Sequence, residues 1–340
     1  MAITINHQTN DISATSGSLT IDGAAAGGGA TDIDGLSDGY SDGSSVGLGS
    51  GALASDDGSD NRNTAVGYEA LFSSATPFGN VAFGYHALRN NSSGGNSTAS
   101  GYEALISNTT GFSNTASGFR ALRTNTTGSS NTASGYESLR NTSTGSFNTA
   151  FGYDALRSNT SNGNNTAVGY RALRANTGSN NTALGVDAGV TITTGSNNLV
   201  LGYQAAPSLA TVSNEVTLGD SSISTLRCQV TTITSLSDAR DKKDVKPLNA
   251  GLDFVKALKP VSFTWDMRDG GKVGQADTGF IAQDLQSAQT NTGVTIPDLV
   301  FDENPNRLEA GYGKLIPVLV QAIKDLSAEV ETLKSQREVK

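Results

Sequence analysis

A glycine recurs along this chain with a period of 17 residues, and this period constrains the fold more than any other feature. The step is 18 residues once and 16 once, and an alanine stands three residues after each of these glycines except at Ser138. A repeat of this length is typical of a stacked solenoid. The ten glycines are Gly49, Gly67, Gly84, Gly101, Gly118, Gly135, Gly152, Gly169, Gly185 and Gly202.

The repeat unit is clearest at Asn148–Arg157 (NTAFGYDALR) and at Asn165–Arg174 (NTAVGYRALR). A unit of this size suits two short strands and two turns. Because neighbouring strands lie about 4.8 Å apart, ten coils would build a rod of roughly 45 to 50 Å. The sequence therefore predicts an elongated spacer rather than a globule.

The residue two positions before each repeat glycine is almost always alanine. This uniformity predicts a close approach of the backbone from coil to coil, where nothing larger fits. The column ends at Val200 and comprises Ala65, Ala82, Ala99, Ala116, Ala133, Ala150, Ala167 and Ala183.

The residue two positions after each repeat glycine forms a column of mixed charge. Parallel coils place these side chains above one another, where an opposite pair contributes about 0.2 to 1 kcal/mol and like charges repel. Most neighbours are opposite or neutral, and only Glu137 next to Asp154 breaks the pattern. The column is Glu69, His86, Glu103, Arg120, Glu137, Asp154, Arg171, Asp187 and Gln204.

The core of one coil is thin, with one or two alanines, one tyrosine or phenylalanine, and a leucine such as Leu122 or Leu156. Three chains around a common axis would bury one another's apolar faces, so we expect a parallel homotrimer. Through its Asn-Thr-Ala-x-Gly-Tyr-x-Ala motif, the region from about residue 45 to 206 resembles the left-handed parallel β-roll of trimeric autotransporter adhesin heads. The handedness is an implication of that resemblance alone.

Composition and charge exclude several function classes. The net charge of −9 opposes nonspecific binding to nucleic acid and to anionic membranes. Residues 1–23 show neither the basic start nor the apolar run of a secretion signal, and no membrane insertion is expected. The lone Cys228 is interpreted as a small buried apolar residue, with an interchain bridge as the alternative.

The C-terminal third contains the motif SDARDKKDV, from Ser237 to Val245. It resembles the self-cleaving intramolecular chaperone of phage endosialidases and many tail fibres, whose signature is Ser-Asp-x-Arg-x-Lys-x-x-Ile. Val245 in place of isoleucine is the single departure. Two further stretches, Leu258–Trp265 and Gly279–Asp284, look like the same family, so that the resemblance covers residues 237–340.

This resemblance implies that Ser237 is a nucleophile, that Lys242 is its general base and that the chain is cut between Leu236 and Ser237, with Asp238 and Arg240 as supporting residues. The chemistry would run once per chain, without an external substrate. Five residues on a regular helix leave two side chains about 140° apart. The turn must therefore be broken, or the pair must form between subunits.

The same residues allow a purely structural interpretation. Ser237 can cap the start of a helix whose first turn is acidic, and Lys242 and Lys243 would then simply be solvated. In that case the motif supports the domain without any cleavage.

A helix near the C-terminus carries apolar residues at alternating steps of three and four. This spacing is a heptad seam and predicts a coiled coil over residues 315–334 that joins three chains. The seam residues are Ile316, Leu319, Ile323, Leu326, Val330 and Leu333.

These patterns divide the chain into four parts and predict a mainly β fold. Residues 1–45 would attach to the tail or baseplate, residues 46–206 form the β-roll shaft, residues 207–236 form an intertwined β neck, and residues 237–340 form a small α+β chaperone domain. The neck is expected from the alternating stretches Asn214–Gly219 and Ile223–Leu236. The run from Asp32 to Gly43 fits a calcium site or a solvated linker, and its spacing favours the linker.

The preferred function is a structural, receptor-binding phage tail fibre, a homotrimer made in the host cytoplasm and incorporated into the virion. A host glycan or protein would be its receptor, and loops 90–96 and 159–164 are candidate contacts, although their composition is that of ordinary turns. A polysaccharide-degrading tailspike is an alternative, but the repeat lacks a second acidic column. A bacterial trimeric adhesin is another. His7 and His86 are isolated, and we expect no metal or cofactor.

Overall fold

The computed structural model describes residues 3–6, 11–14, 19–21, 24–26, 39–41, 45–57, 61–74, 77–223, 225–227, 237–268, 270 and 272–338. The chain separates into two units, residues Met1–Asp220 and Ser221–Lys340, and each is described by itself. Cys228 and Leu236 lie outside the described residues, as does most of the run from Asp32 to Gly43.

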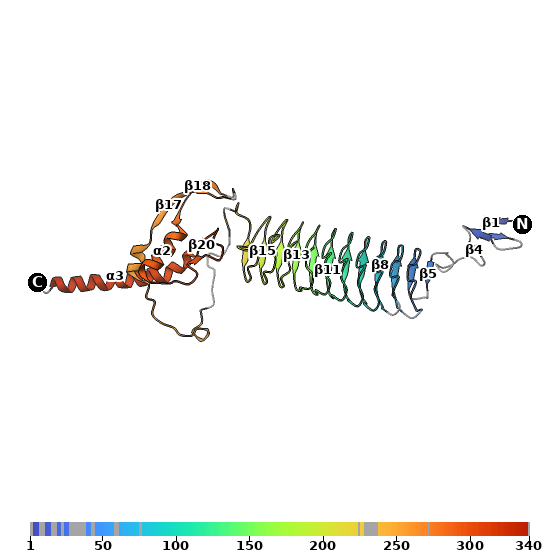
Figure 1. Ribbon diagram of the computed structural model, residues 1–340, viewed down its shortest axis with the longest axis horizontal. Coiled ribbons are helices and arrows are strands. Elements are labelled where there is room, and N and C mark those ends of the chain that lie inside the picture. The colour runs from blue at the N-terminus through green and yellow to red at the C-terminus, as the bar shows by residue number, and fades with distance from the viewer. Residues whose placement is uncertain are drawn as a thin grey trace. The chain divides into compact units, whose positions relative to one another are not determined.

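The first unit begins with short antiparallel pairs and continues as a parallel solenoid (Figure 1). Strand β1 (Ile3–Asn6) pairs with β2 (Asp11–Ala14), and β3 (Leu19–Ile21) pairs with β4 (Ala24–Ala26). Strand β5 (Gly39–Ser41) then pairs antiparallel with β6, the first strand of the solenoid.

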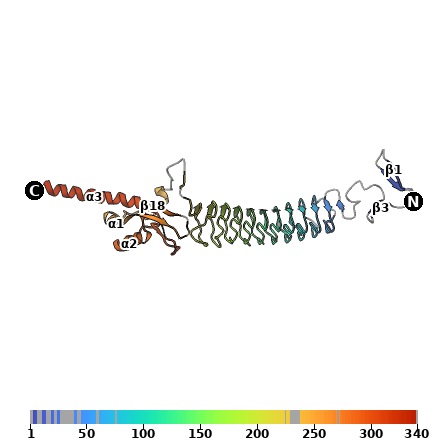
Figure 2. The same ribbon diagram turned by 90° about the horizontal axis from the view of Figure 1, so that it is seen from above.

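Each coil of the solenoid contributes one three-residue strand, and the strands form a single sheet in sequence order (Figure 2). The predicted solenoid is confirmed, whereas the expectation of two strands per coil is wrong. The parallel strands are β6 (Val46–Leu48), β7 (Thr64–Val66), β8 (Val81–Phe83), β9 (Thr98–Ser100), β10 (Thr115–Ser117), β11 (Thr132–Ser134), β12 (Thr149–Phe151), β13 (Thr166–Val168), β14 (Thr182–Leu184), β15 (Leu199–Leu201) and β16 (Val216–Leu218).

Left-handed turns replace the second strand of each coil. In one coil, Glu103 has φ 53° and Leu105 has φ 52°, and the equivalent residues of other coils repeat these values closely. A non-glycine residue in this conformation costs about 1 to 2 kcal/mol. Hydrogen bonds between coils offset that cost, because Glu103 N donates to Tyr85 O at 2.9 Å and Leu105 N donates to Ala121 O at 3.0 Å.

The repeat glycine is required by both conformation and space. Gly118 has φ +132°, and a Cβ atom at this position would lie 2.6 Å from the carbonyl oxygen of Gly135 in the next coil. No side chain can be accommodated at such a distance. The 17-residue period therefore reflects the closest approach between coils.

The core of the solenoid is a stack of alanines and leucines. The predicted alanine column from Ala65 to Ala183 is fully buried, as are Leu122 and Leu156. A second buried alanine column follows the glycines, as at Ala121, and Ser138 takes the place of alanine with its Oγ donating to Gly135 O at 3.0 Å. The tyrosines are not part of this core.

A ladder of asparagines connects the coils through buried hydrogen bonds. Asn131 N donates to Asn114 Oδ1 at 3.0 Å, and Asn131 Oδ1 accepts from Asn148 N at 3.0 Å. The Asn131 side-chain amide also donates to Gly145 O at 2.8 Å. Each ladder residue thus closes its own turn and supports the next coil.

Strand β16 changes the expected boundary of the shaft. Its residues Val216–Leu218 pair in parallel register with β15 of the same chain, so within one chain this strand continues the solenoid past residue 206. A neck made by three chains stays a prediction. Of the second predicted neck stretch, the described residues 223 and 225–227 form no strand.

The second unit combines helices with two short hairpins. The 3-10 helix η2 (Ala239–Asp241) is followed by α1 (Leu252–Ala257), the hairpin β17 (Pro260–Asp266) and β18 (Val273–Phe280), and α2 (Ala282–Thr292). The hairpin β19 (Val300–Phe301) and β20 (Glu309–Ala310) precedes η3 (Tyr312–Lys314) and the long helix α3 (Leu315–Glu338). The small core includes Phe254, Leu285, Leu299 and Val318.

Only the beginning of α3 belongs to this core. Asp325 Oδ2 accepts a hydrogen bond from Leu252 N at 3.0 Å and so fixes α3 against the start of α1. All six residues of the predicted heptad seam are exposed in the single chain, from 40% at Val330 to 65% at Ile316. No helix in the described part of the chain has the length and apolar character needed to cross a bilayer.

Candidate functional site

Ser237 and Lys242 lie in hydrogen-bond contact within one chain. Lys242 Nζ is 2.6 Å from Ser237 Oγ and 3.4 Å from the Ser237 carbonyl oxygen. The contact is possible because η2 ends at Asp241 and Lys242 adopts an extended backbone, with φ −118° and ψ 136°. The broken turn that the spacing required is present, and no second subunit is needed to form the pair.

Asp238 and Arg240 shape the turn between these two residues. Asp238 Oδ1 accepts from Arg240 N at 2.8 Å, and Arg240 Nη2 lies 2.5 Å from Asp238 Oδ2. The Arg240 side chain lowers the pKa of the Asp238 carboxyl, and the backbone hydrogen bond adds to this effect. The capping interpretation of Ser237 is wrong, since Asp238 is the capping residue and the helix is a single 3-10 turn.

The surroundings of the pair are open to solvent. Ser237 and Lys242 are both exposed in the single chain. A serine becomes a nucleophile when a base removes its proton, and a lysine becomes a base when desolvation favours its neutral form. The structure therefore brings the two groups into contact. The desolvation that such chemistry needs would have to come from other protein atoms that cover the pair.

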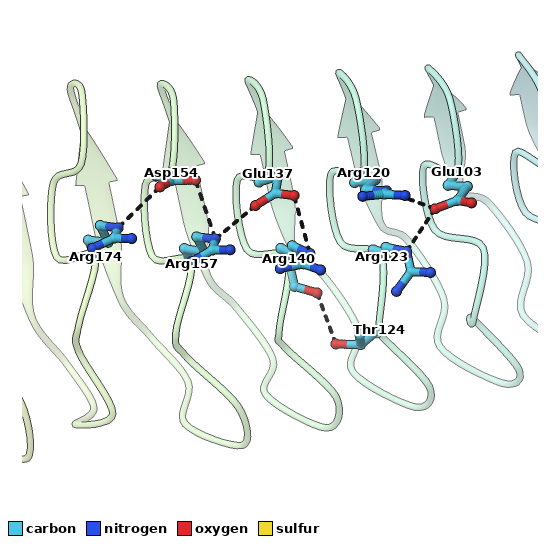
Figure 3. Close-up of polar contacts among 9 residues, drawn as sticks. All are labelled: Glu103, Arg120, Arg123, Thr124, Glu137, Arg140, Asp154, Arg157 and Arg174. Carbon is cyan, nitrogen blue, oxygen red and sulfur yellow. Dashed lines mark hydrogen bonds and ion pairs between the residues drawn. The ribbon is translucent and has the colours of Figure 1, made fainter.

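A set of ion pairs runs along the shaft, where acidic residues alternate with arginines (Figure 3). Glu103 Oε2 lies 2.9 Å from Arg120 Nε and 2.8 Å from Arg123 Nε. Burial on its own raises the pKa of the Glu103 carboxyl, but the hydrogen bonds from Arg123 and Arg120 more than offset this, and its pKa lies below the usual range. A hydrogen bond from the Arg89 guanidinium likewise lowers the pKa of Glu69.

The like-charged neighbours Glu137 and Asp154 are separated by an arginine that is not part of the mixed-charge column. Arg157 Nε lies 2.8 Å from Glu137 Oε2 and 3.4 Å from Asp154 Oδ1 (Figure 3). Arg174 Nε is 3.1 Å from the other oxygen of Asp154. These arginines come from a second column, five residues after the repeat glycine, which the period alone could have revealed: Arg89, Arg123, Arg140, Arg157 and Arg174.

The aromatic residues that follow the repeat glycines form a stack on the surface. From Tyr68 to Tyr170, neighbouring ring centroids lie 4.9 to 5.4 Å apart and the ring planes are within 20° of parallel. The tyrosines in this stack are 40% to 47% exposed. Counting them toward the core of the coil was therefore wrong, because each ring contacts the rings above and below it and leaves its outer edge uncovered.

Within the described residues, no group of three or more histidine, cysteine, aspartate or glutamate side chains is arranged to hold a metal ion. His86 lies in the shaft, with Nε2 3.2 Å from Glu69 Oε2 and its ring 3.8 Å from the Tyr85 ring. His7 lies outside the described residues.

Comparison with known proteins assigns the C-terminal region to a class. Residues 237–300 match the family described as chaperone of endosialidase. A parallel β-solenoid joined to this domain fits a phage tail fibre with a C-terminal chaperone domain.

One curated relative agrees with this class. The chain is 31% identical over 104 residues to the Long tail fiber protein Gp37 of Enterobacteria phage K3, an alignment that covers 29% of this chain and 8% of that protein. The chain thus spans less than a tenth of this relative's length. No solved structure matches the chain.

Proposed function

We propose that this chain is the subunit of a homotrimeric phage tail fibre whose C-terminal domain assembles the trimer. The observation that carries the proposal is the uncovered seam of α3, six apolar side chains with exposures of 40% to 65%. A stripe of this kind is stable in water when equivalent helices cover it, as in a coiled coil. The solenoid would then provide reach, with attachment to the tail or baseplate at its N-terminus and a host glycan or protein as receptor.

A pair of charge substitutions on α3 tests the trimer. Ile323→Glu places a carboxylate in the seam, whereas Ala328→Glu adds the same charge on the side of the helix away from it. With Ser237→Ala in every chain to prevent cleavage, light scattering should give three times 34.8 kDa for the parent chain and for Ala328→Glu. We expect Ile323→Glu to lose most of the trimer. If Ile323→Glu remained a trimer, the α3 seam would not be what holds the three chains together.

As a second function, we propose that Ser237 and Lys242 cut the chain once, between Leu236 and Ser237. The 2.6 Å contact between Lys242 Nζ and Ser237 Oγ supports this proposal. In the reaction, Ser237 Oγ would attack the Leu236 carbonyl carbon as its proton passes to Lys242. The peptide C–N bond would break, the Ser237 nitrogen would gain a proton, and water would later hydrolyse the ester.

Intact mass under denaturing conditions tests the cleavage. The wild type should yield a fragment of 104 residues that begins at Ser237, and the Ser237→Ala variant should not. Lys242→Ala should likewise give only the full-length mass. A single full-length mass for the wild type would leave the domain attached as a clamp and would end the peptidase proposal.

The tailspike alternative has less support. Glycoside hydrolysis uses one carboxyl as an acid and a second as nucleophile or base, at a fixed separation in a groove. Glu103, Glu137 and Asp154 are instead nearly buried and paired with arginines of their own chain. These contacts occupy the carboxylate oxygens, which suits a structural ladder.

A further inference from the structure

One side of the solenoid carries most of its exposed apolar side chains. It consists of three columns, namely the first and third residues of each strand and the residue after each repeat glycine, and we call it the tyrosine face. Its exposed large apolar residues are Tyr68, Val81, Phe83, Tyr85, Tyr102, Tyr136, Phe151, Tyr153, Tyr170, Leu184, Val186, Tyr203, Val216 and Leu218. The turns at the other edge of the coils expose Phe78, Phe112 and Phe147.

The exposed area of this face is large for a single chain. A tyrosine presents about 150 to 250 Å², and the six exposed rings of the stack are nearly half uncovered, so together they expose on the order of 600 Å². The largest apolar patch of a typical monomer is about 300 to 600 Å² in total. The aliphatic and phenylalanine side chains of the strands enlarge the tyrosine face beyond that range, toward the roughly 800 Å² per partner of a stable interface.

The tyrosine face is also free of charged residues from Thr64 to Leu218. A symmetry axis parallel to the long axis of the solenoid brings each residue close to its own copies in the other chains. Any charged residue near that axis would then face the same charge. The mixed-charge column begins one residue after the tyrosines. Its acidic side chains pair with arginines of the same chain, and its Arg120 and Arg171 lie over rings of the stack, 4.8 Å from the centroid of Phe119 and 5.7 Å from that of Tyr170. The turns with Phe112 and Phe147 are uncharged as well, but most of the exposed apolar side chains lie on the tyrosine face, which is therefore the surface best suited to meet identical copies.

We infer that the tyrosine face packs against two further copies of this chain around a threefold axis parallel to the solenoid. This inference rests on the proposed trimer and adds which side of the shaft lies inside it. The ring stack covers seven successive coils, from Tyr68 to Tyr170, so the contact would run along most of the shaft. The turns with Phe112 and Phe147 would then face outward, where a receptor can reach them.

Photo-crosslinking in the full chain tests the assignment. The photoreactive amino acid p-benzoylphenylalanine replaces Tyr136 in one variant and Phe147 in a matched control, since both are exposed aromatic residues, at 42% and 64%. Light scattering first establishes the mass of each variant. After irradiation, denaturing gels should show covalently linked chains for position 136 and only single chains for position 147.

The outcomes separate the face from the trimer. A trimeric mass with crosslinks at position 147 and none at position 136 would overturn the tyrosine face while leaving the proposed trimer intact. A trimeric mass with no crosslinks at position 136, and with a glycan bound there instead, would also overturn it. A monomeric wild-type chain would refute the trimer and the face together.

Discussion

The solenoid and the C-terminal unit obtain their stability in opposite ways. Each coil of the solenoid makes nearly the same contacts with the next, through the alanine column, the asparagine ladder and the acid–arginine ladder. The C-terminal unit has a small core of non-repeating residues around Phe254 and Leu285, and it leaves the seam of α3 uncovered. The solenoid is thus stabilised by repeated contacts between its coils, whereas the C-terminal unit depends on a small core that does not repeat, and both units leave apolar side chains exposed in the single chain.

For the proposed trimer, this difference gives the non-repetitive unit a role in aligning the repetitive shaft. Since the coils are so alike, two chains shifted by one coil of 17 residues would meet with almost the same side chains. Register is weakly specified wherever alternative pairings look alike. The C-terminal unit has no internal repeat, so in the proposed trimer its assembly would select one register and spare the shaft a slow search.

Truncating one core leucine in each unit should have the largest effects and should show most clearly how the two units differ. Leu139 and Leu285 are both almost fully buried, and replacing either with alanine should cost about 2 to 5 kcal/mol. We expect Leu139→Ala to lower the melting temperature of the shaft while trimers still form. Leu285→Ala should instead reduce the yield of trimer. Calorimetry measures the melting temperature and light scattering measures the fraction of trimer in both variants. If both variants changed these two quantities in the same way, the two units would not have the separate roles proposed here.

Interrupting the asparagine ladder should have a smaller effect that is confined to the shaft. Asn131→Ala leaves the buried Asn148 N–H and the Gly145 carbonyl without their partner, at about 1 to 3 kcal/mol for each group. The half-buried Asn141, which lies outside the ladder, provides the control as Asn141→Ala. The melting temperatures of the two variants should differ by several degrees. Equal melting temperatures would show that the ladder adds little to the stability of the shaft.

The acid–arginine ladder should give the smallest effect, visible as a dependence on pH. The pKa of Glu69 and that of Glu103 are lowered in the folded chain, while an unfolded glutamate titrates near about 4.3. Their contribution is therefore complete above that pH and disappears as the pH falls through the lower folded values. Melting scans from pH 6 to pH 3 should show a modest decline that is weaker in Glu103→Gln. A flat profile in the wild type would contradict this account.

Much of the shaft could be predicted from its sequence because period and burial coincide there. The alanine column and Leu122 and Leu156 were recognisable from spacing alone, since any larger side chain would break the stack. The single strand per coil was not predictable, because it depends on residues such as Glu103 and Leu105 adopting positive φ, a conformation that their type does not favour. The outward position of the tyrosines follows from the same turns.

The candidate sites could be predicted only in part. The meeting of Ser237 with Lys242 required a broken turn, and the spacing of five residues indicated as much. The capping role of Asp238 was hidden, because serine and aspartate are equally good caps and only the backbone decides between them. Arg157 was missed because it comes from a different column than the acids it joins, and a search restricted to one position of the repeat cannot see that contact.

The central claim is that the C-terminal unit assembles the shaft into a trimer, and removal of that unit tests it most directly. The full chain, with Ser237→Ala to prevent cleavage, should sediment as a trimer at three times 34.8 kDa. A chain that ends at Leu236 and is produced without residues 237–340 should give no soluble trimer. A stable, soluble trimer formed by residues 1–236 alone would contradict the account.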